Sequence, residues 1–354
     1  MSGRSTMLAD SARRLFESHS TKEVWKRAEG GIWPEALWNA VEEAGFTAAL
    51  LPEDAAGFGA TTAEALTILR IASGHTAPIP LAETMLASWL LAQARVEVPA
   101  GPLSVTPVRR GETLVLARAG DGWHLTGKAT RIPWGRNAAA LATLVSGPDG
   151  LMIAAIPQDG FKAESGLDLA AEPRDTVLID AKLPAAAAAR APDWFNANSL
   201  RAAGAAIRSV QIAGAMERML NLCIEYVTTR VQFGRPIGKF QAIQHSLAIM
   251  AGHAAAAGAA GDMAADALDN RLNPLMIGAA KARAGEAASV GAGLAHQVHG
   301  AIGFTQEYGL HFLTRRLWSW RDEFGKESEW NALVGRIALE AGGDGLWPAI
   351  TEAA

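Results

Sequence analysis

Apolar residues recur with a helical period through most of the first hundred positions. They mark one face of residues 7–18, and the same spacing returns in residues 34–44, 64–73 and 81–94. Apolar positions three and four apart predict amphipathic helices, and glycine and proline between the four segments mark the turns. Residues 1–96 are therefore predicted as a small all-helical domain.

The pattern changes in the middle of the chain. Residues 114–119 and 123–130 flank the turn Gly120-Asp-Gly122, which predicts a β-hairpin. Further short strands are expected between Gly, Pro and Asp turns, at residues 138–146, 151–156 and 175–179. We predict a β domain over residues 97–190, with the alanine-rich end, 183–190, read as a linker.

From about residue 196 the helical period returns and continues to the C-terminus. The predicted helices are long: one carries Val210 to Val227 on its apolar face, and others cover residues 242–268, 273–295 and 327–341. Lengths of this kind suit a four-helix bundle, which we place in residues 191–354. The expected fold class is α+β and mostly α, with the β domain between two helical domains.

Composition and net charge exclude some classes of function. The chain is 49% hydrophobic and 19% charged, and its net charge is −4, so it lacks the basic surface of a nucleic-acid-binding protein. One cysteine, Cys223, excludes an internal disulfide and lies in an apolar helical pattern, which favours a core position. We find no signal peptide and no membrane span. A soluble cytoplasmic protein is expected.

One stretch between two helical patterns concentrates unusual residue types. Residues 230–245 contain Arg230, Arg235, Phe233 and Phe240, with a proline and two glycines that break the helix. Arginines offer planar charged donors to a phosphate or carboxylate, and phenylalanines can cover a flat ring. A plain helix-turn-helix with solvated arginines and core phenylalanines predicts the same pattern, so the residue types alone leave both interpretations open.

Two motifs resemble those of acyl-CoA dehydrogenases. The first resembles the family's R-x-x-F-G-x-x-I-x-x-F-Q signature and begins at Arg230. The second is similar to its K-x-x-A…Q-x-x-G-G-x-G-(F/Y)-x-x-E-Y run, from Lys281 to Tyr308. A weaker match to the turn of the family's first domain covers residues 51–59. The resemblance implies a helical domain, a β domain and a four-helix bundle, in the order that the patterns predict.

The resemblance also implies a reaction and its partners. Enzymes of the family oxidise an acyl-CoA thioester between its α and β carbons, passing hydride to the N5 of FAD, while a carboxylate removes the α proton. An electron-transfer flavoprotein is the implied electron acceptor, and the implied assembly is a homo- or heterotetramer. FAD contacts carried over by the match, serving a neighbouring subunit, are Arg230, Gln232, Phe233, Gln297, Gly300 and Ala301. The family usually has glycine where Ala301 stands, and a glycine helix cap would explain Gly300 equally well.

Other family positions match less closely. The stretch Ser104-Val-Thr-Pro107 is a reduced form of the family's flavin-ring motif, and Trp134 lies later than the tryptophan of the next motif. For Trp134 we expect a core position. The glutamate that serves as base in most members falls on Phe324 here, one residue after Glu323. A second position used by some members falls at about Gly204, and Glu217 and Glu225 on that helix fit a solvated face.

Two explanations for the missing base remain open. Glu323, or its neighbour Asp322, takes over the role; or the chain is the partner that lacks the base in a two-chain dehydrogenase. The second explanation includes a subunit that binds FAD at the interface and does no chemistry of its own. A DNA-associated relative of the same fold would need a basic surface. The alanines and glycines of residues 201–214 hint at room for a bulky acyl chain, although close helix packing uses the same residues.

Overall fold

The computed structural model describes residues 3–107, 109 and 111–351, and the chain forms two compact units. One, here called the helical unit, comprises Met1–Arg27, Leu66–Ala77 and Ala205–Ala354. The other, the mixed unit, comprises Ala28–Ala65 and Pro78–Gly204. Each is described by itself below. The division into three domains at residues 96 and 190 stays a prediction.

The helices of the first hundred residues form where the apolar period predicts them. They are α1 (Gly3–His19), α2 (Lys22–Glu29), α3 (Glu35–Glu43), α4 (Thr62–Gly74) and α5 (Leu81–Gln93). Helix α2 was not predicted, because its eight residues present only a short, highly charged pattern and bury no residue fully. Helix α5 is buried along almost its whole length, including the polar residues Glu83, Thr84 and Ser88.

The mixed unit contains two four-stranded sheets. The first has the order β1 (Leu103–Val105), β4 (Ala140–Gly147), β5 (Gly150–Pro157) and β8 (Ala188–Arg190). The second has the order β2 (Leu114–Ala119), β3 (Gly122–Pro133), β7 (Arg174–Leu183) and β6 (Phe161–Glu164). The predicted hairpin is confirmed, since β2 and β3 pair antiparallel from Leu114↔Gly127 to Ala119↔Gly122.

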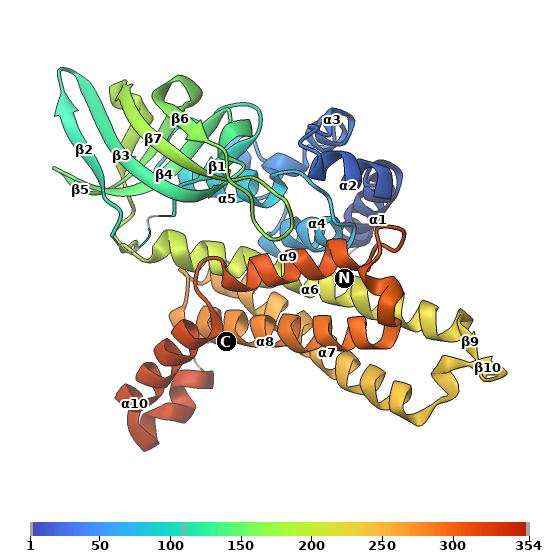
Figure 1. Ribbon diagram of the computed structural model, residues 1–354. Helices are drawn as coiled ribbons and strands as arrows, with labels where there is room; N and C mark the ends of the chain where they lie inside the picture. The colour runs from blue at the N-terminus through green and yellow to red at the C-terminus, as the bar shows by residue number, and fades with distance from the viewer. Residues whose placement is uncertain (1–2, 108, 110, 352–354) are drawn as a thin grey trace. The chain divides into compact units, whose positions relative to one another are not determined.

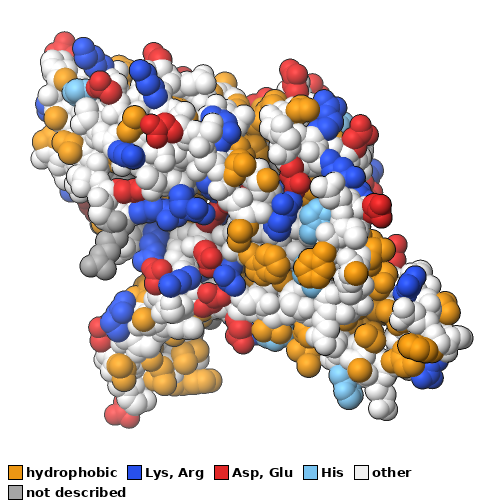
Figure 2. Space-filling view, viewed as in Figure 1, with side chains coloured by type: hydrophobic (Ala, Val, Ile, Leu, Met, Phe, Trp, Pro, Cys, Tyr) orange, Lys and Arg blue, Asp and Glu red, His pale blue; other side chains and the backbone are white. Residues whose placement is uncertain are grey.

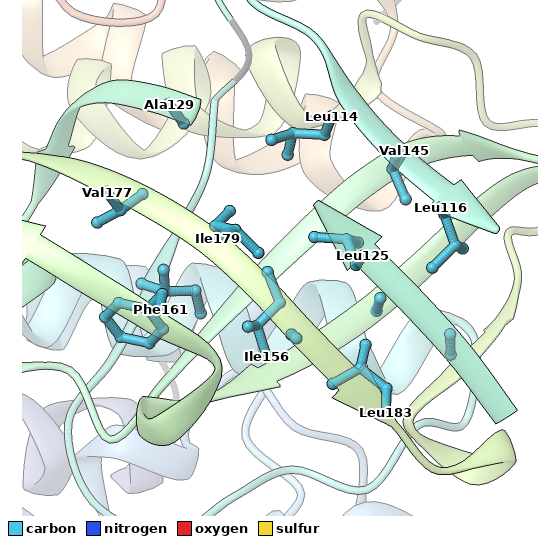
Figure 3. Packing of buried hydrophobic residues seen from close by; sticks show 14 of the residues in the cluster. Leu114, Leu116, Leu125, Ala129, Val145, Ile156, Phe161, Val177, Ile179 and Leu183 are labelled. Carbon is cyan, nitrogen blue, oxygen red and sulfur yellow. The ribbon is translucent and has the colours of Figure 1, made fainter. Parts of the chain in front are cut away.

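Alternating side chains of the two sheets form one apolar core. Leu125, Ile156 and Ile179 are each at most 4% exposed and belong to the same cluster, as Figure 3 shows. The interpretation of residues 183–190 as a linker is wrong. Strand β7 continues to Leu183, and β8 pairs with β5 along Met152–Ala154. The alanines of β8 are small enough to cover this edge without a recognisable alternating pattern.

The helical unit holds the long helices that the C-terminal pattern predicts. These are α6 (Ser199–Thr229), α7 (Gln241–Asp269), α8 (Pro274–His299), α9 (Leu310–Asp322) and α10 (Glu327–Thr351), and Figure 1 shows α7 and α8 running side by side. Asn273 caps α8 by accepting hydrogen bonds from two backbone N–H groups, with Pro274 in the first turn. Helix α10 extends beyond the predicted residue 341, past a kink at Gly342.

Small residues set the spacing of these helices. A Cβ built on Gly214 of α6 would lie 1.9 Å from the backbone oxygen of Arg70 on α4, and one on Gly291 of α8 would lie 2.5 Å from the Met216 side chain. No side chain larger than hydrogen fits at Gly214 without moving α4. Close packing therefore accounts for at least part of the small-residue stretch in residues 201–214. Among the described residues, no helix is long and apolar enough to cross a membrane.

Candidate functional site

The loop after α6 projects its charged and aromatic residues into solvent. Strands β9 (Val231–Gln232) and β10 (Arg235–Pro236) pair antiparallel around Phe233 and Gly234, both of which have positive φ. Arg230 and Gln232 are exposed, and the Phe233 residue is 91% exposed. The Arg235 guanidinium lies 4.3 Å from the centre of the Phe240 ring. A short hairpin that leaves Arg230 and Gln232 in solvent can offer both to an anionic ligand.

The second motif ends in a turn at the C-terminus of α8. Gln297, Gly300 and Ala301 are all exposed there. Gly300 caps the helix with φ 64° and ψ −145°, and its N–H donates to the carbonyl of His296. No atom lies within 4 Å of the position that a Gly300 Cβ would occupy. The surface at this turn is therefore open to an approaching group, with the Gln297 amide as a side-chain donor.

The structure brings these two segments together. Val227 before the loop, Ile237 within it and Val298 beside the turn form one buried apolar cluster. The backbone N–H of Ile237 donates to the carbonyl of Arg230 at 2.9 Å, which holds the ends of the hairpin. Arg230 and Gln297 thus stand on segments joined by a common core, although 67 positions separate them in the sequence.

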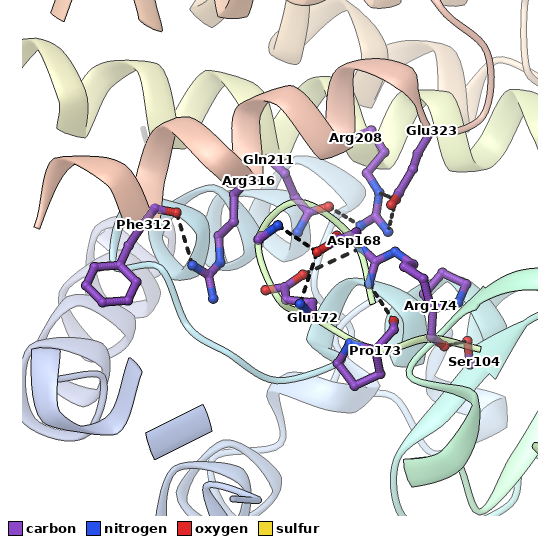
Figure 4. A network of polar contacts seen from close by, with 12 residues as sticks. Ser104, Asp168, Glu172, Pro173, Arg174, Arg208, Gln211, Phe312, Arg316 and Glu323 are labelled. Atoms are coloured by element: carbon purple, nitrogen blue, oxygen red, sulfur yellow. Dashed lines mark hydrogen bonds and ion pairs between the residues drawn. The ribbon is translucent and has the colours of Figure 1, made fainter. Parts of the chain in front are cut away.

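The residue proposed as a substitute base lies in a different environment. Glu323 follows the end of α9 and is 6% exposed. Its Oε2 accepts a hydrogen bond from Nε of Arg208 on α6 at 2.8 Å and lies 2.7 Å from Nη2 of the same guanidinium. Arg208 is 1% exposed and also donates to the side-chain oxygen of Gln211, as Figure 4 shows. A buried guanidinium thus satisfies this carboxylate as an ion-pair partner.

A buried lysine fixes the loop that carries Glu323. The Nζ of Lys281, on α8, donates to the carbonyls of Arg321 at 2.5 Å and Gly325 at 3.0 Å, which lie on either side of the glutamate. The indole N–H of Trp330 donates to the carbonyl of Phe324, whose φ is 54°. Burial lowers the pKa of Lys281 to about 8, although the carboxylates of Glu327 and Glu323 act in the opposite direction.

The other carboxylates considered from the sequence lie at the surface. Glu217 and Glu225 are exposed, and Glu217 lies 3.5 Å from the Arg70 guanidinium. Asp322 is exposed and accepts from Arg321. Cys223 is fully buried, and burial raises the pKa of its thiol to about 12. The prediction that Cys223 is a core residue is confirmed.

In the mixed unit, the reduced flavin-ring motif is buried. The Ser104 hydroxyl donates to the carbonyl of Pro133, whereas the Thr106 hydroxyl has no hydrogen-bond partner within the described chain. Trp134 is 6% exposed and packs edge-on against Trp33, so its expected core position is confirmed. A buried hydroxyl without a partner is unusual, and Thr106 is therefore a polar group that a bound ring could satisfy.

Sequence reasoning missed two groups that define this site. Arg208 directly follows the apolar run of residues 202–207 on α6, and a charged residue at the end of such a run is the signal that would have singled it out. Lys281 was recognised only as the start of a motif. Within the described ranges, histidine, cysteine and carboxylate side chains form no cluster that could hold a metal ion.

Two family models match the chain. The N-terminal domain of acyl-CoA dehydrogenases matches residues 3–95, and the C-terminal domain matches residues 201–321. Among curated proteins, "Acyl-CoA dehydrogenase IpdE2" of Mycobacterium tuberculosis is 28% identical over 319 residues, covering 88% of this chain and 89% of the relative. The protein of the same name from Mycolicibacterium smegmatis is 28% identical over 330 residues, covering 89% of this chain and 93% of the relative.

Solved structures of similar proteins share the fold of this chain. The "Tcur3481-Tcur3483 steroid ACAD G363A variant" superposes with a TM-score of 0.84 at 25% identity, covering 95% of this chain and 98% of that one. The ChsE4-ChsE5 complex of Mycobacterium tuberculosis matches at 22% identity with the same TM-score, covering 96% of this chain and 98% of that one, and supports the fold alone. The predicted fold class is confirmed. With both domain models, relatives along most of its length and this fold, the chain belongs to the acyl-CoA dehydrogenase family of oxidoreductases.

Proposed function

We propose that this chain is one subunit of a two-chain FAD-dependent acyl-CoA dehydrogenase, in which it helps to hold FAD at the interface and leaves the base to its partner. The observation that carries the proposal is the buried ion pair between Arg208 and Glu323. A general base must reach the proton that it removes. A carboxylate whose Oε2 already contacts two nitrogens of a buried guanidinium is poorly placed for that task.

The exposed motif residues support the part of the proposal that concerns FAD. Arg230, Gln232 and Gln297 offer donors to a pyrophosphate, and Phe233 and Ala301 lie beside them on the same loop and turn. The open space beside Gly300 leaves room for a large ligand to approach. When bound, FAD would accept the hydride from the acyl-CoA thioester, and an electron-transfer flavoprotein would be the acceptor in turn. The chain's own residues would bind and orient the cofactor.

Exposed apolar side chains support the assembly. On the helical unit, Phe233, Phe304, Leu339 and Trp347 are 91%, 67%, 84% and 71% exposed. Figure 2 shows apolar side chains gathered over α10 and near the β9–β10 hairpin. Apolar surface of this kind is typical of an interface with another protein. The relative that is 25% identical carries the paired name Tcur3481-Tcur3483, which supports a second acyl-CoA dehydrogenase-like subunit as the partner.

The alternative is a complete enzyme in which Glu323 is the base. A visible absorption spectrum of the chain purified alone, with FAD supplied, would separate the two functions. The spectrum is recorded under nitrogen before and after addition of short, long and polycyclic acyl-CoAs. The polycyclic compounds are included because the Tcur3481-Tcur3483 relative is a steroid enzyme by name. We expect the flavin to stay oxidised with every acyl-CoA.

Two variants sharpen the result. Glu323→Gln removes the buried carboxylate, and Glu225→Gln removes an exposed carboxylate of the same unit as a matched control. Bleaching of the wild-type flavin that disappears in Glu323→Gln and persists in Glu225→Gln would establish Glu323 as the base and refute the partner-subunit proposal. An oxidised flavin in all three proteins is the outcome that supports the proposal.

A further inference from the structure

Three side chains beneath the Gln297–Ala301 turn form a cluster that the proposed function does not use. They are Tyr226 on α6, His299 at the end of α8 and Tyr308 in the segment before α9. The rings of Tyr226 and His299 stack, with centroids 4.4 Å apart and planes inclined by 23°. The Tyr308 ring lies 4.8 Å from the His299 ring and 5.9 Å from that of Tyr226. The cluster therefore joins three separate segments of the helical unit.

Hydrogen bonds give each ring a defined role. The carbonyl of Ala295 accepts from Nδ1 of His299 at 2.8 Å, so this nitrogen carries the proton. In neutral His299, Nε2 is then an acceptor, and the Tyr308 hydroxyl donates to it at 3.0 Å. The Tyr226 hydroxyl donates to the backbone carbonyl of His299 at 3.3 Å. Both the ring and the backbone of the residue before Gly300 are thereby held.

The surroundings of His299 and Tyr308 favour their neutral forms. His299 is 4% exposed, and burial lowers the pKa of its imidazole. Burial also raises the pKa of Tyr308 to about 12. The other titratable groups around the cluster are the Cys223 thiol, 3.9 Å from Nδ1 of His299, and the imidazole of His296. Glu225, Tyr226 and Arg218 act on the Tyr308 hydroxyl from α6, and His311 acts on His296 from α9.

We propose that Tyr226, His299 and Tyr308 are positioning residues that hold the Gln297–Ala301 turn in the conformation that receives FAD. This inference rests on the proposed function, because it assigns these residues to the same cofactor site. The turn is exposed on its outer side and held from beneath by the cluster. Gly300 supplies the positive φ but has no side chain with which to fix the turn. The cluster supplies that rigidity, and preorganised contacts bind a ligand more tightly than mobile ones.

The arrangement also makes FAD binding sensitive to pH. Because His299 has a lowered pKa in the folded chain, the unfolded chain takes up its proton first, and the contribution of neutral His299 to stability falls as pH drops below about 6.5. Protonation removes the acceptor for the Tyr308 hydroxyl and leaves a cation in a buried site. The turn should then loosen, and FAD affinity should fall with it.

The test is a titration of FAD against the full chain, in the assembly in which it purifies, by quenching of flavin fluorescence between pH 5.5 and 8. Because burial lowers the pKa of His299, we expect the Kd of the wild type to stay constant between pH 8 and 6.5 and to rise as the pH falls further. Tyr308→Phe and His299→Phe each keep a ring and remove one hydrogen-bonding partner. Each should raise the Kd at pH 7.5 by about threefold or more and flatten its pH dependence.

A matched control separates this role from general stability. His75 is a half-buried histidine of the same unit, stacked on Phe16, and burial lowers its pKa as well. His75→Phe should keep the wild-type pH profile of FAD binding. The melting temperature of every variant is measured at pH 7.5. Tyr226→Phe, which loses only its hydroxyl, is the milder variant if His299→Phe fails to fold.

The outcomes are distinct. Wild-type Kd values and pH slopes in the Tyr308 and Tyr226 variants, with FAD still bound, would overturn the positioning role and leave the proposed function standing. An affinity loss that merely follows the melting temperature, in the control as in the cluster variants, would overturn it too. An assembly that binds no FAD at any pH would overturn both inferences. Weaker binding with a flat pH profile in the cluster variants alone supports the proposal.

Discussion

The arginines at the two ends of helix α6 differ in burial and in charge pairing. Near its start, Arg208 is 1% exposed and its charge is paired with Glu323 inside the chain. Just beyond its end, Arg230 is exposed on a hairpin. Burying a charge is costly unless the charge is paired, so Arg208 serves the structure as the partner of Glu323. Arg230 is exposed, and its guanidinium is accessible to a ligand.

The largest effect on stability is expected from removing the buried arginine, Arg208. Arg208→Ala leaves the Glu323 carboxylate buried without its guanidinium and should destabilise the chain by about 3–5 kcal/mol. Urea unfolding measures the loss. The double variant Arg208→Met with Glu323→Leu removes both charges and should be less destabilised than Arg208→Ala. Equal losses in the two would mean that the ion pair is not what the fold requires at this position.

A second prediction concerns the lysine that holds the same loop. Since burial lowers the pKa of Lys281 to about 8 from its usual 10.5, the unfolded chain binds the extra proton between these pH values. Stability from this group should therefore rise with pH across that window, by at most about 1.4 kcal/mol per unit.

The measurement is the free energy of unfolding of wild type and Lys281→Met at several pH values from 7.5 to 10.5. The difference between the two should grow with pH. Lys239→Met changes an exposed lysine in the 3-10 turn after the hairpin and serves as the control, with a difference from wild type that stays constant. A constant difference for Lys281→Met as well would contradict the predicted pKa.

The smallest effect on folding is expected at the exposed end. Arg230→Ala should leave the free energy of unfolding within about 0.5 kcal/mol of wild type and weaken FAD binding about tenfold or more, the effect of one charge-assisted hydrogen bond. Flavin content after purification and a fluorescence titration measure it. Lys239→Ala, in the 3-10 turn that follows the hairpin, is the matched control. Unchanged flavin binding in Arg230→Ala would remove Arg230 from the site.

Local patterns predicted most of the fold and singled out the exposed part of the candidate site, whose role stays a prediction. The apolar period gave α6, α7 and α8, because each is long and amphipathic. Helix α9 was missed, since histidine, arginine and tryptophan obscure its apolar positions. The exposed site follows a contiguous motif from Arg230, and a motif is readable along the chain.

The buried part of the site could not be read in the same way. Arg208 and Glu323 are 115 residues apart and meet only through the packing of α6 against the end of α9. The pairing of Lys281 with two backbone carbonyls leaves no trace in residue types, because every residue has a carbonyl. Contacts of this kind depend on tertiary structure, and only the charged residue at the end of an apolar run hints at them.

The close approach of α4 and α6 at Gly214 constrains how such a chain can evolve. A methyl group at this position would meet the Arg70 carbonyl at 1.9 Å, so the order of substitutions matters. A lineage can replace the glycine only after other changes have moved α4 outward, because the reverse order passes through an intermediate with a displaced helix. Gly214 is therefore easily retained during evolution and difficult to replace by a single mutation.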